Sequence, residues 1–181
     1  MVKRISDTDF NSMSNEEIFF VDTNVLFAVH FLELRWEAEK VSQYANFILR
    51  LLKNGNKICV SALNLQELFH LVENNEFRQY KAVNHLGGSF NKKMYREIEE
   101  ERTRLAQDLQ NKYLEISEQY SVVSGNITGD MIKQFLDDYN KHFFDPIDFL
   151  TVKYNSNGIV NFITDDSDFK KYPEINVYTY E

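Results

Sequence analysis

Short apolar runs alternate with longer amphipathic segments along the chain. Five of these runs are bounded by turn-forming residues and have the length expected of buried strands. They lie at residues 18–21, 57–61, 121–124, 159–163 and 176–180. Between them, apolar residues recur every three or four positions across residues 34–52 and again across residues 65–72, which is typical of amphipathic helices. The pattern therefore predicts strands that alternate with helices.

Further helices are predicted in the second half of the chain. A glycine-rich break at residues 87–89 is followed by a helical period from residue 94 to residue 116, which predicts one long helix. Another helix is predicted at residues 128–139. The last one begins at Asp145, since an aspartate before a proline is a common helix start, and runs to about residue 154.

Strands that alternate with helices imply a mainly parallel sheet whose two faces are both covered. We therefore predict an α/β fold of the three-layer α/β/α class, with a sheet of four or five strands. The chain has 181 residues, a length that one domain accommodates. We expect a single domain over residues 1–181, with a helical insertion at about residues 76–120.

Composition narrows the class of protein. The hydrophobic content is 43 %, yet no apolar run approaches the roughly 20 residues that a membrane-spanning helix requires, so no membrane association is predicted. The first ten residues have no apolar stretch typical of a secretory signal. Cys59 is the single cysteine and lies in an apolar run, which predicts a core position and suits a reducing compartment. We predict a cytoplasmic location.

Charge is unevenly distributed along the chain. The net charge is −8, although proteins that bind nucleic acids usually carry an excess of Lys and Arg. One block, residues 77–96, has basic and aromatic side chains and no acid. Its cations are candidates for substrate binding: Arg78, Lys81, Lys92, Lys93 and Arg96. Aromatic faces combined with cations suit single-stranded RNA, and a solvated helix and loop is the alternative.

Four acidic residues are placed where an α/β fold would bring them together. Asp22 and Asp166 each follow a predicted strand, and ligands of open parallel sheets bind beyond the carboxyl ends of the strands. Glu67 lies in the helix after the second strand, and Asp148 lies in the first turn of the helix before the fourth. Carboxylate oxygens are the ligands that Mg²⁺ and Mn²⁺ prefer. The sequence therefore predicts a divalent-metal site.

Three segments resemble the motifs of the PIN-domain nucleases, in particular their VapC-like ribonuclease branch. The segment FVDTNVL at residues 20–26 resembles the opening motif of that family. The segment SALNLQE at residues 61–67 is similar to the second motif, and TDDSDF at residues 164–169 is similar to the closing one. Asp148 matches the third acid of the family by its spacing from Thr164. The stretch between residues 75 and 119 resembles the family least.

The resemblance implies a metal-dependent endoribonuclease that hydrolyses phosphodiester bonds with a water activated by one or two Mg²⁺ or Mn²⁺ ions. Its implied residues fall into three groups. They are Asp22, Glu67, Asp148 and Asp166 as catalytic, metal-binding acids, Asp168 as an accessory metal ligand, and Asn24 and Thr164 as residues that orient ligands and water. An RNA substrate is implied, and an antitoxin-like protein partner and a homodimer are both compatible with the branch.

Other interpretations of the same residues stay open. Asp22 and Asn24 could cap the helix after the first strand, Glu67 could be a surface residue, and Asp148 could favour a helix dipole. The whole protein could be a catalytically inactive module that binds RNA or another protein. It could also be a metal-dependent phosphohydrolase of small molecules. His and Cys positions have no zinc-like spacing, and no glycine-rich phosphate loop is present.

Overall fold

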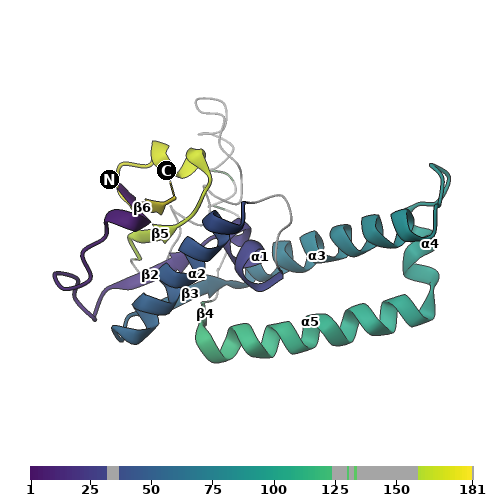
Figure 1. The fold of residues 1–181 in the computed structure, drawn as a ribbon, viewed down its shortest axis with the longest axis horizontal. Helices are drawn as coiled ribbons and strands as arrows, with labels where there is room; N and C mark the ends of the chain where they lie inside the picture. The colour runs from purple at the N-terminus through teal and green to yellow at the C-terminus, as the bar shows by residue number, and fades with distance from the viewer. Residues whose placement is uncertain (32–36, 124–129, 131–132, 134–158, 181) are drawn as a thin grey trace.

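The computed structural model describes residues 1–31, 37–123, 130, 133 and 159–180 (Figure 1). A parallel sheet lies at one end of the molecule, and a long pair of helices projects from it. The elements are β1 (Val2–Arg4), the short 3-10 helix η1 (Ile5–Asp7), β2 (Ile18–Val21), α1 (Thr23–Phe31), α2 (Ala38–Lys53), β3 (Lys57–Ser61), α3 (Ala62–Val83), α4 (Lys92–Glu97), α5 (Glu99–Gln119), β4 (Ser121–Val123), β5 (Asn161–Ile163), the 3-10 helix η2 (Ser167–Lys171) and β6 (Asn176–Thr179).

The strands form one six-stranded sheet in the order β1-β6-β5-β2-β3-β4, and every neighbouring pair is parallel. The predicted α/β/α class and parallel sheet are confirmed. All five predicted strands are present, and the sixth, β1, was not predicted. Its three residues are all exposed, so the strand lacks the apolar signature by which a buried strand is recognised.

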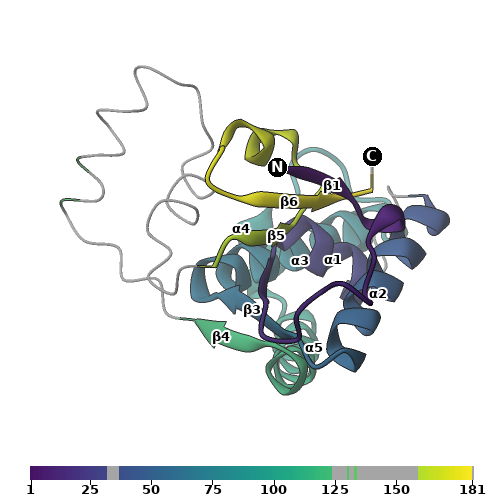
Figure 2. The same ribbon diagram turned by 90° about the vertical axis from the view of Figure 1, so that its left-hand side faces the viewer.

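Side chains of the central strands alternate between the two faces of the sheet, as the pleat requires. Phe19 and Val21 of β2 pack into the larger core, which α1, α2, α3 and α5 complete. Phe20 points to the opposite face and packs with Phe162 of β5 and Phe169 of η2. Cys59 is buried in this second core, at the kind of position predicted for it. Of the described helices, α1, α2, α3 and α5 contribute to the larger core and η2 contributes to the second one (Figure 2).

The residues predicted to form an insertion, about 76–120, lie in a hairpin made by α3, α4 and α5, which already begins at Ala62 (Figure 1). One long helix was predicted over residues 94–116, and that prediction is wrong at one point. Ile98 adopts an extended conformation that ends α4, and its carbonyl then accepts the first hydrogen bond of α5 from Arg102 N. The cause is tertiary, because Tyr95 is buried against Phe77 and Tyr80 of α3 and turns α4 toward that helix.

Two predicted helices, at residues 128–139 and 145–154, fall almost entirely on residues that the structure does not describe, and Asp148 is among those residues. In the part of the chain that is described, no helix has both the length and the apolar character needed to cross a membrane.

Candidate active site at the carboxyl edge of the sheet

Three of the predicted acids come from three neighbouring strands. Asp22 directly follows β2, Asp166 lies in the turn after β5, and Glu67 lies in the second turn of α3, the helix that follows β3. Because β2 lies between β5 and β3, these positions meet at one edge of the sheet. The chain leaves β2 toward β3 on one side and leaves β5 toward β6 on the other. Such a switch point is where open α/β sheets bind ligands.

Asp22 is fixed at this edge by both its backbone and its side chain. Its N–H donates to Ile163 O at 3.0 Å, and its carbonyl accepts from Leu26 N at 3.0 Å, which starts α1. In the side chain, Oδ1 accepts from Thr23 N at 2.7 Å and Oδ2 accepts from Thr164 Oγ1 at 2.8 Å. An ordinary cap would accept from the second or third helical residue instead. Capping alone therefore does not account for this buried carboxylate.

Glu67 is tied to Asp22 through the residue between them in space, Thr23. Thr23 Oγ1 donates to Glu67 Oε2 at 2.7 Å and accepts from Asn64 Nδ2 at 3.0 Å. Asn64 is held in turn by Ser61, which caps α3 by accepting from Asn64 N at 3.1 Å and donates its hydroxyl proton to Asn64 Oδ1. The first turn of α3 thus fixes the rotamer of Thr23, and Thr23 orients Glu67.

Asp166 is joined to Asp22 by Thr164. The Thr164 hydroxyl that donates to Asp22 also accepts from Asp166 N at 2.9 Å. Asp166 Oδ1 accepts from Asp168 N at 2.8 Å and so caps η2. One hydroxyl therefore fixes the separation of two acids. Together with the Thr23 bridge, it links the residues Asp22, Glu67 and Asp166 in a single network of hydrogen bonds, in which Asp166 takes part through its backbone N–H.

The acids influence one another electrostatically. Burial raises the pKa of Asp22 from its ordinary 3.8 to about 7, while the hydrogen bonds from Thr164 and Thr23 oppose the rise. The negative charges of Glu67 and Asp166 raise the pKa of Asp22 further. Both carboxylates are therefore close enough to Asp22 to act on its charge.

Some acids at this edge have a basic partner among the described residues and others do not. In the described part of the chain, Asp22, Glu67 and Asp166 form no ion pair with any Lys, Arg or His. Two neighbouring acids do. Lys40 Nζ lies 2.5 Å from Asp165 Oδ2, and Lys171 Nζ lies 2.6 Å from Asp168 Oδ1. The three acids of the network are the ones left without a cation.

The donor set suits a hard divalent ion. All three side chains offer oxygen, and no hydrogen bond from a described residue engages Glu67 Oε1 or Asp166 Oδ2. A carboxylate oxygen that accepts one hydrogen bond also keeps a second lone pair. Among the described residues, however, no group of three or more His, Cys, Asp or Glu side chains is already arranged as a metal cluster. A bound ion would need the carboxylates to turn toward it, and Asp148 lies outside the described residues.

The other predicted site residues are placed as follows. Asn24 is exposed in the first turn of α1, and the contacts expected of it are made by its neighbour Thr23. Thr164 lies within the network, and Asp168 faces Lys171. The side chains of Asp168 and Asn24 therefore take no part in the network among the described residues.

The basic block lies at the far end of the hairpin from the sheet (Figure 1). Arg96 makes a bidentate pair with Glu73 of α3, at 2.5 and 2.6 Å, and Lys92 lies 3.6 Å from the same carboxylate. Lys81 lies near the Phe77 ring. Arg78 and Lys93 are exposed and form no ion pair with another described residue. None of these five cations forms an ion pair with Asp22, Glu67 or Asp166 in the described part of the chain.

An apolar groove of about 570 Å³ lies between α3 and α5 and reaches the acid network. Glu67 is part of its lining, so the groove and the network share a side chain. Its walls are mainly apolar, and they include Leu63, Phe69 and Leu109. The groove extends from the sheet edge toward the hairpin.

Several functional candidates were missed by the sequence analysis. Thr23 and Asn64 are buried polar residues that connect acids, and Lys40 and Tyr44 of α2 contact the turn that bears Asp166. Ser61 carried a readable signal, since a serine that ends a strand and precedes a helix is a typical cap. The other four were not recognised, because the contacts that bring them to the site join residues distant in sequence, as between Asn64 and Thr23 or between Lys40 and Asp165.

No protein-family model matches this chain, and no curated protein matches it by sequence. The hydrogen-bond network at the sheet edge is therefore the main structural basis on which a function can be inferred.

Proposed function

We propose that this protein is a divalent-metal-dependent nuclease that hydrolyses phosphodiester bonds, with RNA as its substrate. The observation that carries the proposal is the linkage of Asp22, Glu67 and Asp166. Thr23, through its N–H and hydroxyl, and Thr164, through its hydroxyl, connect these acids at the switch point of the sheet, and no described cation forms an ion pair with them. Charges left unpaired at such a position are costly to the fold, which is why perturbed acids tend to mark functional sites.

Asp22, Glu67 and Asp166 would hold the metal ion. When bound, Mg²⁺ or Mn²⁺ would lower the pKa of a coordinated water and polarise the phosphoryl oxygen. Asp148 is proposed as a further ligand on the sequence resemblance alone. We do not carry Asp168 into the proposal, because Lys171 already pairs with it.

The protein residues around the acids have supporting tasks. Thr164 and Thr23 donate to carboxylate oxygens of Asp22 and Glu67, so they orient these acids. Asp22 must lose its proton to bind a cation, and a pKa of about 7 places that event near neutral pH. The affinity for Mn²⁺ is therefore expected to rise with pH across neutrality, because the cation competes with this proton.

The groove beside Glu67 favours a polymeric substrate over a small phosphoester. It continues from the acids between α3 and α5 and offers apolar walls along its length. Bases of single-stranded RNA stack on such surfaces. The resemblance to VapC-like ribonucleases adds a cytoplasmic location and an antitoxin-like protein partner to the proposal.

The test is cleavage of single-stranded RNA by purified protein with Mn²⁺ or Mg²⁺, next to single-stranded DNA and a panel of small phosphoesters. Asp22→Asn and Asp166→Asn should each lower the cleavage rate by more than about 100-fold, since loss of a residue that only supports a metal ligand costs about 10- to 100-fold. Asp108→Asn, the same substitution on the distant α5, should cleave like the wild type. Undiminished cleavage by both site variants would refute the proposal.

A further inference from the structure

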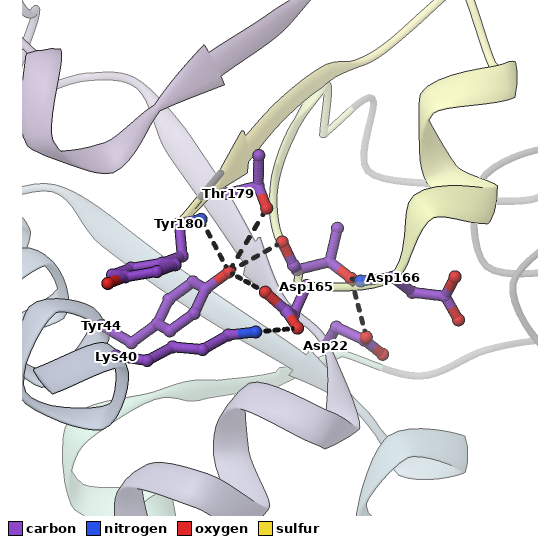
Figure 3. Close-up of polar contacts among 8 residues, drawn as sticks. Asp22, Lys40, Tyr44, Asp165, Asp166, Thr179 and Tyr180 are labelled. Atoms are coloured by element: carbon purple, nitrogen blue, oxygen red, sulfur yellow. Dashed lines mark hydrogen bonds and ion pairs between the residues drawn. The ribbon is translucent and has the colours of Figure 1, made fainter. Parts of the chain in front are cut away.

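Two side chains of α2 contact the turn that bears Asp166 (Figure 3). Lys40 Nζ donates to Asp165 Oδ2 at 2.5 Å. Tyr44, which is buried, brings its hydroxyl to 3.1 Å from both Thr164 O and Asp165 Oδ1. Asp165 points toward α2, whereas Asp166 points away from it (Figure 3). The turn thus presents one acid to α2 and the next acid toward the network.

The Tyr44 hydroxyl also joins this turn to the last strand. It accepts from Tyr180 N at 3.0 Å, directly after β6, and its single proton is shared between Thr164 O and Asp165 Oδ1. Burial, together with the charge of Asp165, raises the pKa of Tyr44 well above its usual range, so the hydroxyl keeps its proton. It is therefore a permanent donor to the turn.

Each contact in this region restrains a different part of the turn. The backbone N–H of Thr164 donates to Tyr178 O in β6, and its carbonyl faces Tyr44. Its hydroxyl donates to Asp22 and accepts from Asp166 N. A shift of the turn would therefore move the one hydroxyl that spaces two acids of the site.

We propose that Lys40 and Tyr44 are positioning residues of the acid site. They hold the Thr164–Asp166 turn through Asp165 and the Thr164 carbonyl, so that Asp166 is presented next to Asp22. The inference rests on the proposed function, and it adds residues from α2 that contact none of the acids Asp22, Glu67 and Asp166 directly.

The Lys40–Asp165 pair differs from an ordinary surface ion pair in its burial. The side chains are only 19 % and 22 % exposed, so both charges have lost much of their water. Removal of Lys40 would leave Asp165 as a further uncompensated acid beside Asp22 and Asp166. The turn is then expected to move Asp165 toward solvent, because a partly buried charge without a partner is unfavourable.

The experiment measures Mn²⁺ affinity by calorimetry and RNA cleavage for Lys40→Met and Tyr44→Phe. Methionine keeps most of the aliphatic length of Lys40 without its charge, and phenylalanine keeps the buried ring of Tyr44. Each variant should bind Mn²⁺ about 10-fold more weakly and show a lower kcat with little change in KM, as expected when a supporting contact of a metal site is lost.

Three further variants separate positioning from general stability. Lys40→Arg should retain most of the affinity. Lys40→Glu combined with Asp165→Lys should recover part of what each single change loses, since a reversed pair restores the contact. Lys112→Met removes a lysine that pairs with Glu115 at 2.7 Å on the distant α5, and it should bind Mn²⁺ like the wild type.

The possible failures are distinguishable. Wild-type Mn²⁺ affinity and kcat in both Lys40→Met and Tyr44→Phe would overturn the positioning role and leave the proposed function standing. A loss as large in Lys112→Met would also overturn it. A wild-type protein that neither bound Mn²⁺ nor cleaved RNA would overturn the proposed function and this inference together.

Discussion

Arg104 of the hairpin pairs with several acids, whereas the acids joined to Asp22 at the carboxyl edge of the sheet have no basic partner among the described residues. On the hairpin, Arg104 lies 2.6 Å from Glu76, 2.9 Å from Glu101 and 3.2 Å from Asp108. At the sheet edge, the acids joined to Asp22 have one another and two threonines as neighbours, with no described cation in an ion pair. The acids around Arg104 on the hairpin therefore have a cation as a neighbour, and the acids joined to Asp22 have none among the described residues.

This difference teaches how to separate structural acids from functional ones. An acid that serves the fold gains from a basic partner, as Glu73 does when Arg96 lowers its pKa. A buried acid whose neighbours are also acids has its pKa raised and costs stability when it ionises, as Asp22 does. The fold tolerates that cost at the position where ligands of parallel sheets bind.

The largest effect expected from this contrast is on stability. The folded pKa of Asp22, about 7, lies above its ordinary 3.8, so the folded protein binds the proton more tightly than the unfolded chain. This contribution is fully present below about pH 4 and is lost as pH rises through 7. The pKa difference corresponds to on the order of 4 kcal/mol of unfolding free energy.

Denaturant unfolding from pH 4 to pH 8, in the presence of a chelator, measures this loss. Asp22→Asn should gain stability relative to the wild type as pH rises, because it has no charge to bury. Asp108→Asn, which changes an exposed acid of the hairpin, should follow the wild type throughout. If the unfolding free energies of Asp22→Asn and the wild type changed with pH in parallel, the charge of Asp22 would not be costly to the fold.

An intermediate effect is expected from the two exposed cations of the basic block. Arg78→Gln with Lys93→Gln should reduce the salt dependence of RNA binding by about 1.4 in log–log slope, since each contact to a single-stranded phosphate contributes about 0.7. Lys92→Gln with Arg96→Gln is the matched control, because both of these cations already pair with Glu73 and are less free to contact phosphate. A slope that is equal in the wild type and in both double variants would assign the whole block to structure.

The smallest effect is expected on the hairpin itself. Arg104→Gln should cost about 1 kcal/mol of unfolding free energy or less, because this side chain is 47 % exposed and water screens its ion pairs. The loss should shrink further in high salt, and cleavage should be unchanged. A large loss of cleavage in Arg104→Gln would mean that the ion pairs of the hairpin also support the acid site.

Strand ends were predictable from the sequence, and so was part of the site. Asp22 closes a short apolar run and Asp166 follows another, so strand placement alone predicted that both would reach one edge of a parallel sheet. Glu67 was predicted from its motif and lies in α3, joined to Asp22 through Thr23. Local pattern and topology were sufficient to place Asp22 and Asp166, and the resemblance was needed for Glu67.

Other features depend on contacts that sequence patterns do not encode. Lys40 and Asp165 are separated by 125 positions, and nothing local pairs them. The helical period continues through Ile98, so the break there follows from the burial of Tyr95 against α3. The pairing of Arg96 with Glu73 likewise requires the folded hairpin. Tertiary geometry therefore decided which charges were paired and which were left without a partner.

Titration of Mn²⁺ into wild type and Asp22→Asn by calorimetry tests the central claim most directly, because it requires no knowledge of the substrate. Saturable binding is predicted for the wild type, with a stabilisation of about 2.7 kcal/mol when free Mn²⁺ reaches about 100 times its Kd. Asp22→Asn should lose the binding, and Asp108→Asn should retain it. Equal binding by Asp22→Asn and wild type, or no binding by the wild type, would contradict the assignment of the acids to a metal site.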